Sequence, residues 1–71
     1  MKATETIYCE NKTLTVYFET LETDETKAFF SYFIDGTEVK DWGKLISKYQ
    51  RIFDAMVDNL CEGYNVIKWS Y

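Results

Sequence analysis

The sequence contains no histidine and no proline, and it has only three glycines and two cysteines among its 71 residues. Without histidine, the commonest general base and metal ligand are missing, which also excludes a Cys–His nucleophile. Cys9 and Cys61 are too few for a zinc site, and we expect free thiols in a reducing compartment. Three scattered glycines cannot form a phosphate-binding loop. We therefore expect a protein that is no enzyme and that uses no metal or cofactor.

Long apolar runs and a basic charge are also missing. Residues 1–6 lead into a polar strand pattern, unlike the apolar core of a signal peptide, and no run approaches the ~20 apolar residues that cross a bilayer. The net charge is −4, with eight Lys plus Arg and a pI near 4.6. Phosphate contacts need basic groups, so we expect neither nucleic acid nor membrane as a partner, but a protein with a basic surface. The expected location is the cytoplasm, or the host cytoplasm if a phage encodes the chain.

Aromatic residues are abundant, at 18% of the chain, and 46% of residues are hydrophobic. A length of 71 residues predicts one domain over 1–71 with a narrow stability margin. Each buried ring removes a large apolar area from water, so this composition can supply a core without disulfides.

Alternating apolar residues predict two strands at the start of the chain. Ile7 and Cys9, and then Leu14, Val16 and Phe18, lie on one face. A two-residue turn at Asn11–Lys12 places Cys9 opposite Leu14. The segment Lys27 to Ile34 is apolar on both faces and predicts a central strand. A tight turn at Asp35–Gly36 then leads to a brief strand within Thr37 to Lys40.

A long amphipathic helix follows, with Asp41 as its N-cap and Gly63 as the left-handed residue beyond its end. A last strand runs from Val66 to Tyr71, with Ile67, Trp69 and Tyr71 on one face. The expected fold is α+β, in the order β-β-β-α-β. A three-stranded antiparallel meander is covered on one face by the helix, and the last strand is the fourth. The buried stripe of the helix comprises Trp42, Leu45, Ile46, Tyr49, Ile52, Phe53, Met56, Val57 and Leu60.

One helix covers one face of the sheet, so the other face is expected to remain open. It carries tyrosines beside an acidic turn, and exposed tyrosines with carboxylates suit a basic partner surface. The turn lacks the residue order of a calcium loop, and its alternative interpretation is a solvated loop. The first candidate surface therefore comprises Tyr8, Tyr17, Glu19, Glu22, Asp24 and Glu25.

The exposed ridge of the helix is the second candidate surface, comprising Lys44, Lys48, Arg51, Asp58 and Glu62. Its bases come first and its acids last, which is the reverse of the order that the helix dipole favours. Together with like-charge pairs at i, i+4, this order is expected to cost roughly 1–2 kcal/mol of stability. One explanation is local compensation, by Asp41 or Glu38 near the lysines and by Lys68 near the acids. The other is a ridge shaped for a bipolar partner.

These features predict a small acidic protein-interaction domain. In size and charge alone it resembles the nucleic-acid-mimicking inhibitors, such as anti-CRISPR proteins, of phages and mobile elements, which implies occupation of a basic nucleic-acid-binding surface. One alternative is a homo-oligomer, such as a homodimer, that associates through the open sheet face. A second alternative is a sheet that stacks single-stranded nucleic acid on its rings, although the chain lacks a basic groove.

Overall fold

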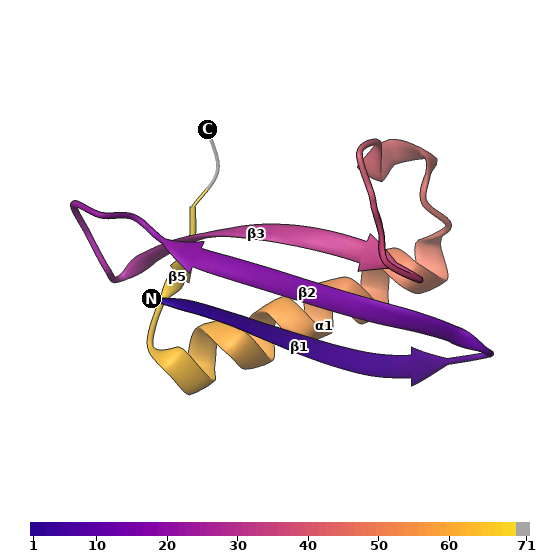
Figure 1. Ribbon diagram of the computed structural model, residues 1–71, viewed down its shortest axis with the longest axis horizontal. Coiled ribbons are helices and arrows are strands. Elements are labelled where there is room, and N and C mark those ends of the chain that lie inside the picture. The colour runs from indigo at the N-terminus through magenta and orange to yellow at the C-terminus, as the bar shows by residue number, and fades with distance from the viewer. Residues whose placement is uncertain (70–71) are drawn as a thin grey trace.

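The computed structural model describes residues 1–69 and has the expected α+β fold (Figure 1). Three antiparallel strands form a meander, the long helix covers one face, and a short C-terminal strand pairs with the third strand. In chain order the elements are β1 (Lys2–Cys9), β2 (Lys12–Thr20), β3 (Lys27–Ile34), β4 (Thr37–Glu38), the 3-10 helix η1 (Trp42–Lys44), α1 (Ser47–Tyr64) and β5 (Ile67–Lys68).

The β1–β2 hairpin has the predicted faces but a different register. Its turn residues are Glu10 and Asn11, with φ of 49° and 67°, rather than Asn11 and Lys12. Cys9 therefore pairs with Lys12, and Ile7 pairs with Leu14 instead of Val16. The shift is two residues, which leaves every side chain on its predicted face because strand side chains alternate with period two.

The strand β3 is central, as its apolar pattern predicts. It pairs along its length with β2, and its other edge is shared by two short strands. The brief strand within Thr37 to Lys40 is confirmed as β4, which pairs with Phe33 and Ile34 through the Asp35–Gly36 turn. At the other end of that edge, β5 runs parallel to Lys27 and Ala28. Within the described residues the last strand thus covers only Ile67–Lys68, and positions 70 and 71 lie outside them.

The core lies between the sheet and α1. From β2, the side chains of Leu14, Val16 and Phe18 are fully buried, and Phe53 meets them from the helix. Burying such a side chain contributes about 1.5–3 kcal/mol relative to leaving it in water. The remaining buried hydrophobic residues are Ala28, Met56, Val57, Leu60 and Val66.

The helix begins five residues later than its apolar pattern predicts. Asp41 precedes the 3-10 helix η1 without a side-chain capping bond, Leu45 and Ile46 are extended, and α1 starts at Ser47. A continuous helix would place Trp42 about 16 Å along the axis from Phe53. The two ring centroids instead lie 6.2 Å apart, and the Trp42 ring is 5.0 Å from that of Tyr32. Aromatic packing against the core therefore outweighs helical continuity.

The helix also ends later than predicted. Gly63 is inside α1, and the left-handed residue is Asn65, with φ of 54°. The backbone N–H of Asn65 bonds the carbonyls of Cys61 and Glu62, and the N–H of Val66 bonds the carbonyl of Cys61. Asparagine tolerates the left-handed region, so it can take the place usually held by glycine.

Candidate interaction surface

The open sheet face holds both tyrosines of the first candidate surface, but at different ends. Tyr8 pairs with Thr13 beside the β1–β2 turn, whereas Tyr17 pairs with Thr4. Four strand positions, about 13 Å, therefore separate them along the sheet. Tyr8 is 83% exposed and Tyr17 is partly buried. Only Tyr17 lies on the side of the acidic turn.

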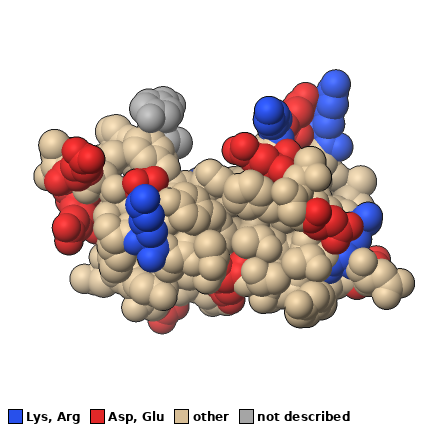
Figure 2. All heavy atoms as spheres, viewed as in Figure 1, with Lys and Arg blue, Asp and Glu red and all other residues tan. Residues whose placement is uncertain are grey.

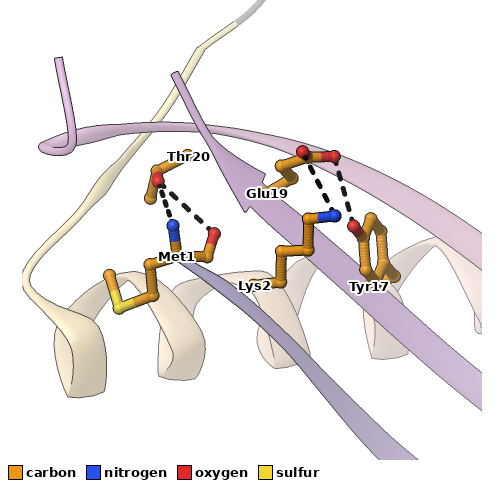
Figure 3. A network of polar contacts seen from close by, with 5 residues as sticks. All are labelled: Met1, Lys2, Tyr17, Glu19 and Thr20. Atoms are coloured by element: carbon orange, nitrogen blue, oxygen red, sulfur yellow. Dashed lines mark hydrogen bonds and ion pairs between the residues drawn. The ribbon is translucent and has the colours of Figure 1, made fainter. Parts of the chain in front are cut away.

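Tyr17 belongs to a small polar network at the start of β1 (Figure 3). Its hydroxyl donates to a carboxylate oxygen of Glu19 at 3.2 Å, and Glu19 also pairs with the Lys2 ammonium at 3.7 Å. Desolvation and then the bond to Glu19 raise the pKa of Tyr17, so it stays a neutral donor. Beside them, the Met1 amino group donates to the hydroxyl of Thr20 at 2.8 Å. The charge of Glu19 is therefore shared with Lys2 rather than free for a partner.

The acidic turn between β2 and β3 contains one structural carboxylate. Asp24 accepts hydrogen bonds from the backbone N–H and the hydroxyl of Thr26, and it lies 3.9 Å from the Lys27 ammonium. The hydroxyl and then the backbone bond lower the pKa of Asp24. Glu22 and Glu25 are exposed and form no ion pair with a described residue. These two are the carboxylates that the turn offers to a partner.

The second candidate surface does not form one ridge, because Lys44 belongs to η1 and not to α1. Lys44 and Lys48 are therefore not an i, i+4 pair of one helix. Lys44 lies 3.9 Å from Asp41, and Lys48 forms a short ion pair with Glu10, which raises the pKa of Lys48. Compensation is thus present for Lys44 and Lys48, partly through a residue, Glu10, that the sequence does not indicate. Arg51 is exposed on α1 and has no ion pair with a described residue.

The acids of the helix, Asp58 and Glu62, have no ion pair with a described residue, and Lys68 does not supply one. The ammonium of Lys68 instead lies 5.8 Å from the centre of the Tyr32 ring. Both carboxylates are exposed in the C-terminal half of α1, where they oppose the helix dipole.

The fold brings these helix acids to the same end of the molecule as the acidic turn. Figure 1 shows the C-terminal end of α1, the β2–β3 loop and the start of β1 together. The ring of Tyr64, in the last turn of α1, lies 5.0 Å from Phe18 near the end of β2. Ile67 donates its backbone N–H to Thr26 in the loop. We name this end the acidic end; its carboxylates are Glu19, Glu22, Asp24, Glu25, Asp58 and Glu62.

The side chains of the acidic end, these six carboxylates with Lys2, Lys27 and Lys68, balance to −3 within the side-chain net charge of −4. The Met1 ammonium group adds one positive charge at this end. The opposite end is mixed, because bases and acids alternate around the β1–β2 turn, the β3–β4 turn and η1. Figure 2 shows this difference, with mostly red groups at the left and red and blue groups together at the right. The protein therefore carries an electrostatic asymmetry along its 36 Å long axis.

The two thiols lie near opposite ends of α1 and are free. Cys9 closes β1 near Lys48, at the start of the helix, and Cys61 lies close to its end. Burial, with a smaller effect of Asp58, raises the pKa of Cys61, which favours the unreactive thiol. The two cysteines are thus not placed as a redox pair.

A groove of about 460 Å³ runs along the outer edge of β3, in the gap between β4 and β5. Its walls include the rings of Tyr32, Trp42 and Trp69. Two acids, Glu38 and Asp54, and two bases, Lys40 and Lys68, also line it, so its formal charge is zero. None of the residues of the first candidate surface lines this groove, and no sequence pattern indicates it, because it exists only where two short strands leave an edge uncovered.

Comparisons with protein families, with curated proteins and with solved structures find no match to this chain. Among residues 1–69, no three histidine, cysteine, aspartate or glutamate side chains form a group that could hold a metal ion. The helices in that range are also too short or too polar to cross a membrane. The acidic end, where Glu22, Glu25, Asp58 and Glu62 are exposed without an ion pair to a described residue, is the candidate interaction site.

Proposed function

We propose that this protein is a non-enzymatic interaction domain that binds a basic surface of another protein through its acidic end. Most concretely, it occupies a nucleic-acid-binding surface and inhibits its partner, as anti-CRISPR-like proteins of phages and mobile elements do. The observation that carries the proposal is the gathering of uncompensated carboxylates at one end. Glu22 and Glu25 from the loop join Asp58 and Glu62 from the helix, and none has an ion pair within the described chain.

Electrostatic complementarity of this kind mainly increases association rate and specificity. Carboxylates on two separate elements present several negative groups across one end, as successive phosphates do along a nucleic acid. Tyr17 adds contact area beside Glu19, and its hydrogen bond to Glu19 holds its ring in one orientation. A preorganised aromatic side chain loses little conformational entropy on binding.

The test compares two double variants of equal net charge. Glu22→Gln/Glu25→Gln removes two charges from the acidic end, and Glu38→Gln/Asp54→Asn removes two exposed charges elsewhere. Tagged wild type and both variants capture proteins from a lysate of the host cells in which the chain is expressed, and affinity for the purified captured protein is measured. We expect the first variant to bind about 2- to 30-fold more weakly, from two lost charge contacts, and the control to bind like wild type.

Two further readouts address the mechanism. Affinity should fall steeply with added salt, since the contacts are ionic. A nucleic acid that binds the captured protein should compete with this domain for it. Equal weakening by both double variants would show that net charge alone, and not the acidic end, governs binding. Simultaneous binding of the domain and the nucleic acid would refute occupation of the nucleic-acid site.

A further inference from the structure

The outer edge of β1 is an uncovered sheet edge of eight residues. β1 stands last in the sheet order and, among residues 1–69, pairs only with β2. Met1 accepts a backbone hydrogen bond from Thr20, and Cys9 pairs with Lys12 across a two-residue turn. Odd-numbered residues of β1 therefore exchange their backbone bonds with β2, and the N–H and C=O groups of residues 2, 4, 6 and 8 point outward.

Two devices that block strand addition are missing from this edge, since β1 contains no proline and no bulge interrupts its register. Its two charged side chains, Lys2 and the core-facing Glu5, are the only blocking devices that it carries. Its apolar residues are also incompletely covered on both faces. Ile7 and Cys9 are half-buried against the edge of the core, and Tyr8 is 83% exposed on the open face. The other edge of the sheet, on β3, is covered at both ends by β4 and β5.

We propose that β1 pairs antiparallel with β1 of a second copy, so that two sheets join edge to edge around a two-fold axis. The charge asymmetry favours this direction. β1 starts at the acidic end, where Lys2 meets Glu19, and finishes at the mixed end beside Lys48. Antiparallel pairing sets the acidic end of each copy beside the mixed end of the other, whereas parallel pairing would bring two acidic ends together.

The side chains select one register. With Glu5 opposite Glu5, two carboxylates would meet in a pair whose Cα atoms are about 4.5 Å apart, which is unfavourable. With Thr6 on the axis, Thr4 faces Tyr8 and Glu5 faces Ile7, so no like charges meet and the apolar residues are covered. A register with Thr4 on the axis would leave Tyr8 without a facing residue, and one with Ile7 on the axis would pair only residues 5–9 of each β1, against residues 3–9 with Thr6 on the axis. The pairing therefore places Thr6 opposite Thr6.

In this register the backbone N–H of Thr6 forms the central contacts of the dimer, so removing that N–H tests the proposal. The two central hydrogen bonds are each donated by a Thr6 N–H, which faces away from β2 within one copy, so Thr6→Pro removes both without breaking the β1–β2 ladder. Thr6→Val is the matched control, because it changes the side chain and keeps the N–H. Sedimentation equilibrium from nanomolar to high-micromolar concentration should show a dimer for wild type and Thr6→Val. For Thr6→Pro we expect a dissociation constant raised about 10- to 100-fold.

Cross-linking reports the register independently. In a Cys9→Ala/Cys61→Ala background, Thr6→Cys should form a disulfide-linked dimer, because Cα atoms in a hydrogen-bonded pair lie about 5.5 Å apart, within disulfide range. Thr4→Cys should not, since the second Thr4 lies four positions away. A wild-type monomer at all concentrations would overturn the proposal. So would an unchanged dimer in Thr6→Pro with native circular dichroism, which would place self-association elsewhere, such as the open face. Thr6 is not one of the charged residues that the partner-binding test changes, so these results are separate from those that test partner binding.

Discussion

Glu62→Lys should stabilise the fold and weaken partner binding at the same time. Glu62 lies in the last turn of α1, where the helix has its negative end, and Asp58 lies one turn before it. Reversing the charge removes an unfavourable dipole interaction and adds a favourable one, together about 0.6–2 kcal/mol. It also converts Asp58–Glu62 repulsion into attraction with the acid on the N-terminal side, worth about 0.4–1 kcal/mol. The expected gain of about 1–3 kcal/mol corresponds to a melting temperature roughly 4–24 °C higher for a domain of this size.

Thermal unfolding followed by circular dichroism measures this gain, with Glu22→Lys as the control. That variant changes the net charge equally at the same end, but in a loop rather than in a helix. Both variants should bind the basic partner more weakly, whereas Glu62→Lys should exceed Glu22→Lys in stability by about 1 kcal/mol or more at low salt. The difference should shrink at 1 M salt, where the screening length is about 3 Å. Equal stability of the two variants at low salt would refute the dipole argument.

Gly63→Ala should raise the free energy of unfolding by about 0.5–1 kcal/mol, because Gly63 is helical and a Cβ there meets open space. Asn65→Ala should lower it by about 1–2 kcal/mol because of the left-handed φ. Urea titrations measure both free energies of unfolding. A loss of stability in Gly63→Ala would show that Gly63, and not Asn65, is the left-handed residue that ends the helix. Asp24→Asn should reduce the amount by which the free energy of unfolding falls between neutral and acidic pH. The pKa of Asp24 is lowered in the folded state, so its contribution is present above the unfolded value near 4 and disappears as the pH falls through the folded value. Urea midpoints between neutral and acidic pH measure this loss, and an unchanged pH profile would contradict the role of the Thr26 bonds.

The faces of the strands were predictable because burial imposes a period of two on Leu14, Val16 and Phe18. The register of the first hairpin was not, because a shift by two residues preserves that period. The position of the hairpin turn in the structure agrees with ion pairs that its residues form with distant parts of the chain. Glu10 in the turn pairs with Lys48 of the helix, and Lys12 lies 3.6 Å from Asp35 of the next turn. Lys48 and Asp35 are distant in sequence from the hairpin, so the alternation of apolar residues within its strands cannot indicate these contacts.

The start of the helix was missed for a similar reason. The spacing from Trp42 to Tyr49 fits a helix, so periodicity cannot distinguish a continuous helix from η1 followed by two extended residues. The distinction comes from the rings of Tyr32 and Phe53, which hold Trp42 against the core.

For the candidate site, the sequence identified every acid of the acidic end but assigned them to two surfaces. Glu22 and Glu25 were assigned to the first candidate surface, with Tyr8 and Tyr17. Glu62 was assigned to the second candidate surface, with the lysines of the helix ridge. The direction in which α1 crosses the sheet brings the acids of the helix to the same end as the acids of the β2–β3 loop. That direction depends on packing rather than on local sequence spacing.

The parallel pairing of β5 with β3 also has a consequence for local opening. It joins residues 27–28 to residues 67–68, across the helix, and closes the longest loop among the strand pairings. Two backbone hydrogen bonds, from Ile67 to Thr26 and from Trp69 to Ala28, lie along this contact. A strand of two exposed residues is expected to open far more often than the core strands, so the amide hydrogens of Ile67 and Trp69 should exchange with solvent well before that of Val16. Each opening would remove one wall of the groove beside β3 and expose its edge to water.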